Sequence, residues 1–500
     1  MSPEDRARDL PGLIERDDSH PALVVPGSGS AVSYEQLQGA VRRVAGQLVG
    51  AGVRPGDSVA MCFGNNPEMV ICFLGIVTAG ASAAPLNPAY TTGEFTSYLS
   101  DLRPRLMVRH GSAGAPLEAA CAELRIDVLT AAGTSAAEVA LDAGTALGEI
   151  PDPDPDAAAL LLHTSGTTSR PKVVPLRQRH LVSSARAIAS FYELGPQDVS
   201  HCVMPLFHVH GLVASTLATL ATGGTVLVPP RFSASSFWPD TVAHGATWYS
   251  AVPTIHGVLS ARAASEPVPD HRLRFARSCS SALPRPLQEE AEERFRIPIA
   301  QAYGMTEAAH QMASNPLPPE ERRPGSVGRA TGIEIGILDE QWRQLPPEHV
   351  GEVAVRGASV IDGYRDNPEA NASSFRDGWF RTGDLGRLSA DGYLTLDGRI
   401  KEMINRGGEK ISPIEVEEVL LRHPGVAEAA VFGRANEKYG ESVAAAVVPA
   451  GSVTEADLQA HCAAVLATFK VPDSIALLDA IPKGPTGKVQ RRFLADQVKA

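Results

Sequence analysis

The fold is decided by the stretch LLLHTSGTTSRPK, residues 160–172, an apolar run that breaks into a hydroxyl-rich loop and ends on a lysine. Gly166 lets the backbone approach a ligand closely, and Lys172 supplies a positive charge for a polyanion. The G-x-x-x-x-G-K-S/T spacing of a Walker motif is missing here and at residues 484–488. The stretch therefore predicts a phosphate-binding loop of another kind, with an ordinary surface turn as the alternative. Its hydroxyl donors are Thr164, Ser165, Thr167 and Thr168.

Helical and strand patterns alternate before this loop. Residues 33–36 have the S-x-x-Q form of a capping box, and apolar residues then recur at helical spacing through residue 48. Residues 58–62 predict a short strand. The apolar run 69–84 contains glycine, threonine and serine, and it predicts a buried helix followed by a strand, because a membrane span needs about 20 mostly apolar residues. The alternation predicts a largely parallel sheet covered by helices, with ligands at the carboxyl ends of its strands.

The chain is long enough for at least two domains, because one hydrophobic core stops growing at about 250–300 residues. The alternating prolines of residues 151–156 predict an extended linker between two subdomains. Residues 328–397 show short strands and turns, and Ser412 with Pro413 predicts a helix start beyond them. We predict an α/β fold in which residues 1–398 form two α/β subdomains and a small β-rich unit, and residues 399–500 form a small α+β domain.

The composition favours a cytoplasmic enzyme whose substrates are small molecules. The chain carries 57 acidic and 45 basic side chains, a net charge of −12, and no basic block that would indicate nucleic acid or an anionic membrane as a partner. Its six cysteines lack CxxC or metal-like spacing, which predicts reduced thiols. We expect no secretory signal, no peroxisomal address and no membrane insertion. The sequence leaves a homodimer open.

Four further motifs follow the loop in order. They are YGMTE at residues 303–307, WFRTGD at 379–384, GRIK at 398–401 and PTGK at 485–488. With these motifs the chain resembles the adenylate-forming superfamily of acyl-CoA synthetases, peptide-synthetase adenylation domains and luciferases, from about Ser33 to Arg492. Ser169 with Arg170, and residues 204–211, 277–281 and 308–311, resemble the oxalate–CoA ligase branch of that superfamily. Val173 departs from that branch as well, since a glycine often follows the loop lysine.

The resemblance implies ATP, Mg²⁺ and coenzyme A as co-substrates and ion, and it assigns roles to individual residues. Residues 164–172 would hold the β- and γ-phosphates, Thr306 would contact phosphate, and Glu307 would help to hold Mg²⁺. Asp384 would accept the ribose hydroxyls, and Arg399 would reach the ribose or its phosphate. Adenine would lie between Tyr303 and the segment that contains Ser281 and Ala282, with Gly304 and Met305 beside it.

The same resemblance predicts a mobile C-terminal domain. Lys401 would be the hinge about which it rotates between two half-reactions, and Lys488 would be the lysine that promotes adenylate formation. Arg406, Gly407 and Gly408 would line the tunnel for the pantetheine arm of CoA, where glycines leave room for a thin chain. Because the thiolate of CoA attacks the adenylate directly, no protein nucleophile is required.

The acid pocket is expected to be polar. Ser280, Ser281 and His310 would place hydroxyls and an imidazole near the acid, and a buried polar group without a partner costs about 1–3 kcal/mol. Such a pocket favours a small polar acid, and His310 or His208, if protonated, could partner a second carboxylate. The alternative is that these histidines only gate or pack the pocket.

The leading interpretation is an ATP-dependent acid–CoA ligase that forms an acyl-AMP, releases pyrophosphate and transfers the acyl group to CoA, with oxalate the favoured acid. Malonate, medium-chain fatty acids and aryl acids remain alternatives. So does an adenylating enzyme that loads a carrier protein, although no carrier domain is evident in the sequence. A nucleotide-binding regulator without turnover is a third class, which the presence of Lys172, Glu307 and Lys488 disfavours.

Overall fold

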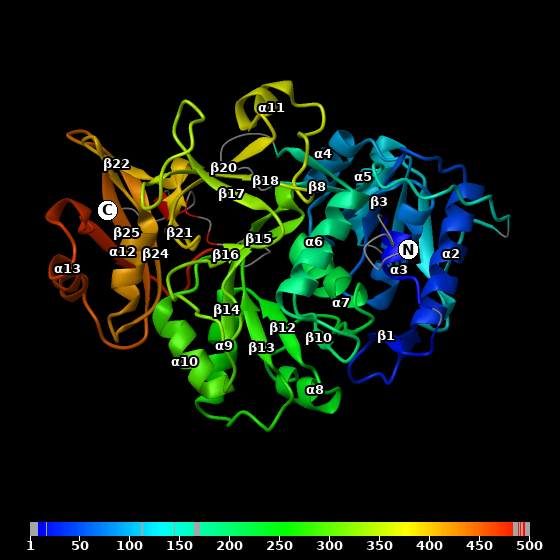
Figure 1. The fold of residues 1–500 in the computed structure, drawn as a ribbon, viewed down its shortest axis with the longest axis horizontal. Helices are drawn as coiled ribbons and strands as arrows, with labels where there is room; N and C mark the ends of the chain where they lie inside the picture. The colour runs from blue at the N-terminus through cyan, green and yellow to red at the C-terminus, as the bar shows by residue number, and fades with distance from the viewer. Residues whose placement is uncertain are drawn as a thin grey trace.

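The structure is a computed structural model that describes residues 9–16, 18–111, 114–144, 146–164, 171–483, 489, 491 and 494–495. The predicted phosphate-loop residues Ser165, Gly166, Thr167 and Thr168, and the predicted lysine Lys488, lie outside these residues. Figure 1 shows four units along the chain, from blue at the right, through green and yellow, to orange and red at the left.

The first unit is a seven-stranded sheet in the order β7-β6-β5-β3-β4-β8-β9, parallel except at its two edge strands. Its strands are β3 (Ser58–Cys62), β4 (Ser82–Leu86), β5 (Leu106–His110), β6 (Val128–Ala132), β7 (Ala140–Leu141), β8 (Ala158–His163) and β9 (Val173–Arg177). Its helices are α2 (Tyr34–Gly50), α3 (Pro67–Thr78), α4 (Thr92–Leu102), α5 (Ala115–Leu124) and the short η2 (Ala136–Glu138). The predicted phosphate loop follows β8, at the carboxyl end of a parallel strand, as expected.

The second unit is a nine-stranded sheet in the order β16-β15-β14-β13-β12-β10-β11-β1-β2, with a parallel centre. Its strands are β1 (Pro21–Val24), β2 (Ala31–Ser33), β10 (Val199–His201), β11 (Thr225–Leu227), β12 (Trp248–Ala251), β13 (Phe275–Ser278), β14 (Ile299–Met305), β15 (His310–Ser314) and β16 (Arg329–Ala330). Its helices are α1 (Leu10–Leu13), α6 (Gln178–Phe191), the π-helix η3 (His210–Leu217), α7 (Ala218–Leu220), α8 (Phe237–Ala243), α9 (Pro253–Ala263), α10 (Arg285–Phe295) and η4 (Thr306–Ala308).

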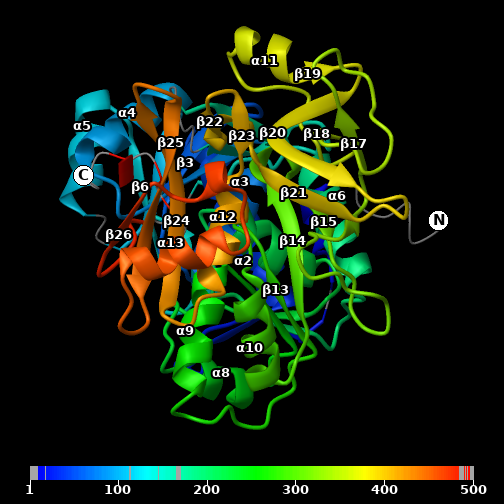
Figure 2. The same ribbon diagram turned by 90° about the vertical axis from the view of Figure 1, so that its left-hand side faces the viewer.

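Two smaller sheets complete the chain. The β-rich unit has the order β17-β18-β20-β19 with β21 on β20, and α11 (Pro368–Ser374) covers it. The C-terminal sheet has the order β23-β22-β25-β24 with β26 on β25, and it faces the viewer in Figure 2 together with α12 and α13. The strands are β17 (Glu334–Leu338), β18 (Gly351–Arg356), β19 (Phe375–Arg376), β20 (Trp379–Leu388), β21 (Leu394–Arg399), β22 (Ile404–Arg406), β23 (Glu409–Ile411), β24 (Val426–Asn436), β25 (Gly440–Pro449) and β26 (Ser474–Leu477). The helices of the C-terminal part are η5 (Ile400–Glu402), α12 (Pro413–Leu421), α13 (Glu455–Ala463) and η6 (Thr468–Lys470).

The local sequence signals are mostly confirmed. Ser33 forms the capping box of α2, and Ser412 caps α12. The apolar run 69–84 lies in the buried helix α3 and in β4, and among the described residues no helix is long and apolar enough to cross a membrane. All six cysteines are free and buried.

The linker prediction is wrong. Residues 151–156 lead from β7 to β8, and both strands belong to the first sheet. The chain changes sheet later, between β9 and β10, through α6. The segment ends in a turn that is tied to the start of α6, where the N–H of Arg179 donates to the carbonyl of Pro155 at 2.9 Å. The predicted boundary at residue 398 falls at the end of β21, and the division into domains 1–398 and 399–500 stays a prediction.

Candidate active site

The two ends of the predicted phosphate loop are tied together. The N–H of Thr164 donates to the carbonyl of Lys172 at 2.9 Å, and the N–H of Lys172 donates to Thr164 Oγ1 at 3.4 Å. The Nζ of Lys172 lies 4.3 Å from the centroid of the Tyr364 ring. Burial lowers the pKa of Lys172, and the repulsion of Lys401 acts in the same direction, whereas Glu307 raises it. Lys172, Glu307 and Lys401, which the sequence places far apart, therefore share one electrostatic environment.

Glu307 is a buried carboxylate beside this lysine. It lies in η4, directly after β14, and its side chain accepts a hydrogen bond of 2.9 Å from the hydroxyl of Tyr364. Burial raises the pKa of Glu307, while the Tyr364 hydroxyl and the positive charge of Lys172 lower it. The described residues contain no group of three or more His, Cys, Asp or Glu side chains that could hold a metal ion. A single oriented carboxylate fits Mg²⁺, which in phosphate sites takes one or two carboxylates and completes its shell with substrate phosphates and water.

The predicted ribose site is a second buried carboxylate. Asp384 on β20 stands opposite Arg399 on β21, and the Nε of Arg399 lies 3.1 Å from Asp384 Oδ1. The hydroxyl of Tyr303 donates to Asp384 Oδ2, and the negative charge of Asp384 raises the pKa of Arg399. Each oxygen of the Asp384 carboxylate has two lone pairs, so both oxygens can still accept hydrogen bonds from ribose hydroxyls. Thr306, Gly304 and Met305 are partly exposed around this site, and Ser281 and Ala282 lie in the loop after β13.

The predicted acid pocket is built around Arg277, a residue to which the sequence interpretation gave no role. Arg277 lies on β13 with its side chain fully buried. Its Nε donates to Gln311 Oε1 at 2.8 Å, one terminal nitrogen donates to Ser250 Oγ at 2.9 Å, and the other lies 3.0 Å from His310 Nδ1. No carboxylate among the described residues lies within 4 Å of this guanidinium. A buried cation without a carboxylate partner is rare, because a buried charge normally requires a counter-charge.

His210 joins the same network. Its Nε2 lies 2.7 Å from Ser250 Oγ, its Nδ1 lies 3.0 Å from Ser280 Oγ, and its ring centroid lies 4.9 Å from that of His310. His210 is the first residue of the π-helix η3, a rare element that often marks functional sites. His208 is only partly buried, and its Nδ1 accepts the N–H of His210 at 3.3 Å. His210 thus joins Ser280 and His310 in one network, and His208 adjoins this network through the N–H of His210.

The contact with Arg277 sets the role of one ring nitrogen of His310. A guanidinium can only donate, so Nδ1 of His310 accepts from Arg277 in this contact. Arg277 therefore brings a positive charge into the predicted acid pocket.

Backbone strain fixes these side chains. Ser280, Ala309 and His310 have φ angles of +75°, +52° and +114°. Residues other than glycine seldom adopt this region of backbone conformation. At the adjoining bulge between β14 and β15, a Cβ on Gly304 would lie 1.9 Å from the carbonyl oxygen of His310. A glycine is therefore required where the YGMTE motif passes His310.

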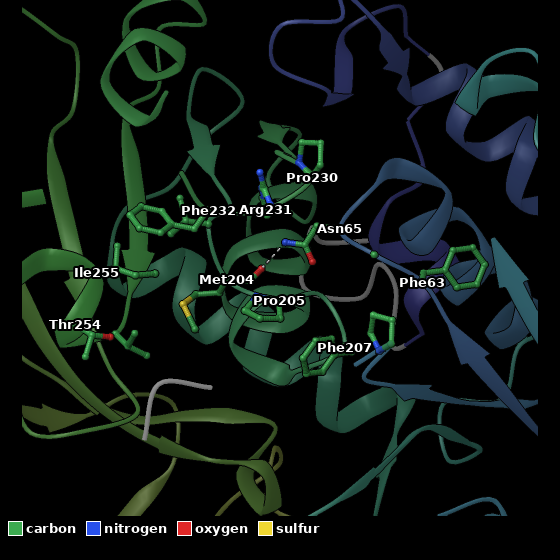
Figure 3. Close-up of a pocket in the computed structure, with 14 residues that line it drawn as sticks. Phe63, Asn65, Met204, Pro205, Phe207, Pro230, Arg231, Phe232, Thr254 and Ile255 are labelled. Atoms are coloured by element: carbon green, nitrogen blue, oxygen red, sulfur yellow. Dashed lines mark hydrogen bonds between the residues drawn. The ribbon is translucent and has the colours of Figure 1, made fainter. Parts of the chain in front are cut away.

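An apolar cavity of about 380 Å³ adjoins the acid network. Figure 3 shows that Phe63 and Asn65 come from the first unit, whereas Phe207, Phe232 and Ile255 come from the second. The carboxamide of Asn65 accepts the N–H of Leu206 at 2.9 Å and donates to the carbonyl of Met204 at 3.1 Å, which links the two units. Two segments connect the cavity with the acid network along the chain. Met204 and Phe207 line the cavity just before His210, and Val252 lines it just after Ser250.

The predicted CoA residues lie on the C-terminal sheet. Arg406 ends β22, and Gly407 and Gly408 form the turn to β23 with φ angles of +62° and +98°. The guanidinium of Arg406 lies 5.2 Å from the ring centroid of Tyr439, donates to the carbonyl of Phe469 at 2.7 Å and pairs with Asp473 at 3.0 Å. Lys401 lies in η5, between β21 and β22.

Five residues of these networks have no functional role in the sequence interpretation: Arg277, His210, Gln311, Ser250 and Tyr364. The first three lie in the segments 277–281, 204–211 and 308–311, which resemble the oxalate–CoA ligase branch, but the sequence interpretation gave them no role there. Ser250 and Tyr364 carry no local signal, because their partners lie 27 and 57 residues away.

Comparisons with known proteins show the family of the chain. Residues 14–365 match the family AMP-binding enzyme, and residues 415–488 match the AMP-binding enzyme C-terminal domain. The chain is 47% identical to an oxalate–CoA ligase of Arabidopsis thaliana, over 97% of this chain and 98% of the relative. It is 39% identical to an oxalate–CoA ligase of Saccharomyces cerevisiae, over 95% and 94%. The crystal structure of ATP-bound MatB from Rhodopseudomonas palustris superposes with a TM-score of 0.88 at 30% identity, covering 98% of both chains. The chain therefore belongs to the AMP-binding enzymes and is an AMP-forming acid–CoA ligase.

Proposed function

We propose that this chain activates oxalate and transfers it to coenzyme A. The observation that carries the proposal is the fully buried guanidinium of Arg277, which has no carboxylate among the described residues within 4 Å. Oxalate carries two carboxylates, and both are ionised at neutral pH. One must attack phosphorus, and the other would supply the negative charge that the protein does not provide near Arg277. The two oxalate–CoA ligases among the relatives support the same acid.

The network also disfavours a fatty acid. An alkyl chain would lie against His310, His210 and Ser280 and would leave the buried guanidinium of Arg277 without a negative charge, which costs free energy. A carboxylate can accept hydrogen bonds from imidazole N–H and hydroxyl groups at once. The specificity is therefore set by partners that only a small polar acid can satisfy.

In the first half-reaction, a carboxylate oxygen of the acid attacks the α-phosphorus of ATP, and pyrophosphate leaves. Lys172 and the loop that it closes would hold the β- and γ-phosphates, and Asp384 with Arg399 would hold the ribose. Glu307 would hold Mg²⁺, which neutralises phosphate charge when bound. Lys488 would reach the reacting oxygens from the C-terminal part. In the second half-reaction the thiolate of CoA attacks the acyl carbon and AMP leaves, so none of the buried cysteines is needed.

CoA would approach from the side of the apolar cavity. Its walls include Phe207 and Val252, which lie three and two residues along the chain from His210 and Ser250 of the acid network, so a thin pantetheine arm there would end near the acid. After rotation about Lys401, Arg406, Gly407 and Gly408 would cover that arm. The domains 1–398 and 399–500 are the bodies that we expect to rotate. We place the reaction in the cytoplasm, and the homodimer stays a prediction.

The test is pyrophosphate release with oxalate, malonate, acetate, octanoate and coumarate, each with and without CoA. We expect the highest kcat/KM for oxalate and formation of its thioester with free CoA. A preference for octanoate over oxalate of more than about tenfold, or about 1.4 kcal/mol, would contradict the pocket argument. Adenylate formation without thioester formation on free CoA would instead indicate a carrier-protein acceptor.

A further inference from the structure

We propose that Tyr364 is a positioning residue that keeps Glu307 and Lys172 from pairing with each other, so that both remain available to ATP and its metal ion. The inference rests on the proposed function, because it assumes that these two groups serve the nucleotide.

The side chain of Tyr364 stands between opposite charges. Its hydroxyl donates to Glu307 Oε1 at 2.9 Å, and the face of its ring lies under the Nζ of Lys172 at 4.3 Å from the centroid. Within the described residues, Lys172 and Glu307 are not within the 4 Å of an ion pair, although each shifts the pKa of the other. One neutral side chain thus satisfies the carboxylate with a hydrogen bond and the ammonium with an aromatic face.

This spacer is neutral, because a phenol hydroxyl keeps its proton at neutral pH and acts as a donor. If the Glu307 carboxylate and the Lys172 ammonium paired directly, ATP and its metal ion would have to break that pair before binding to either group. Contacts to an aromatic face and to a hydroxyl are weaker and are more easily exchanged for phosphate oxygens and a cation.

The backbone around Tyr364 is fastened to both partners. The N–H of Ile361 donates to the carbonyl of Glu307 at 2.9 Å, and the N–H of Arg365 donates to the carbonyl of Val173, next to Lys172, at 3.0 Å. Asn371 of α11 holds Tyr364 itself, because it accepts the Tyr364 N–H at 2.7 Å and donates to the Tyr364 carbonyl at 2.9 Å. Residues 361–365 therefore form a bracket between the predicted metal ligand and the predicted phosphate lysine.

The experiment compares Tyr364→Phe, which removes only the hydroxyl, with Tyr364→Leu, which also removes the ring. Tyr34→Phe is the matched control, since the buried Tyr34 hydroxyl donates to the carbonyl of Gly224 at 2.8 Å, away from this site. Pyrophosphate release is measured against MgCl₂ at fixed ATP, and thioester formation is measured from supplied oxalyl-adenylate. For Tyr364→Phe we expect half-saturating Mg²⁺ to rise about tenfold, which corresponds to about 1.4 kcal/mol, with thioester formation changed less than about twofold. Tyr364→Leu should in addition raise the KM for ATP.

The readout that separates a positioning role from a packing defect is the contrast between the two half-reactions, because a packing defect would weaken both. If Tyr364→Phe matches Tyr34→Phe in Mg²⁺ dependence, or loses both half-reactions equally, the positioning role is overturned. Failure of the proposed function is a different result, because wild type and Tyr34→Phe would then release no pyrophosphate.

Discussion

Replacing Arg277 with methionine should remove the preference for a doubly charged acid. The two charges are the Arg277 guanidinium and the second carboxylate of oxalate, with His310 between them. For unit charges about 6–8 Å apart, Coulomb's law with an effective dielectric constant of about 20 gives an attraction of about 2–3 kcal/mol. The variant should therefore lose about 30- to 150-fold in kcat/KM for oxalate. The suitable comparison is oxamate, in which an uncharged amide replaces one carboxylate, so the ratio of kcat/KM for oxalate to that for oxamate isolates the charge.

The assay is pyrophosphate release with both acids, together with thermal unfolding. Ser250 Oγ, Gln311 Oε1 and His310 Nδ1 would each lose the donor that Arg277 supplies, so some loss of stability is expected. Arg274→Met is the control, because Arg274 lies just before the same strand but pairs with Asp198 at 2.9 Å. An oxalate-to-oxamate ratio within twofold of wild type, in a folded Arg277→Met protein, would refute the reasoning.

Three further predictions concern the nucleotide side and the strained backbone. Lys488→Ala should abolish adenylate formation and spare thioester formation from supplied adenylate; equal loss in both half-reactions would contradict its role. Asp384→Asn should raise the KM for ATP by about tenfold or more, because a charge-assisted hydrogen bond contributes about 1.5–3 kcal/mol, and an unchanged KM would exclude the ribose contact. Gly304→Ala should lower stability by about 1–3 kcal/mol in urea unfolding, since its Cβ would lie 1.9 Å from the His310 carbonyl oxygen; a stability equal to wild type would show that the bulge can open.

Sequence reasoning worked where the signal was local. The capping box at Ser33 and the helix start at Ser412 depend on residues three positions apart, and both are present. The β-rich unit was equally visible from its short strands and turns. The linker at residues 151–156 misled, because proline content reports an extended backbone and says nothing about which sheet the chain joins next.

The site was predicted in its motifs but not in its networks. Asp384 and Arg399 were expected near one nucleotide, and the register of β20 and β21 places them opposite each other. The sequence did not predict roles for Arg277 and Tyr364, because these roles depend on neighbours from distant segments. Arg277 has no carboxylate partner among the described residues, and Tyr364 stands between the charges of Glu307 and Lys172. Such relations exist only after distant segments have packed.

The burial of all six thiols makes the native chain a ready background for fluorescent labelling. Burial raises the pKa of Cys202 and of Cys462 to about 11, so these groups carry almost no reactive thiolate at neutral pH. A cysteine at Val258 on α9, 49% exposed, and another at Val465 after α13, 60% exposed, would take up maleimide dyes selectively. Energy transfer between that pair would test the rotation proposed for residues 399–500 without removing a single native cysteine.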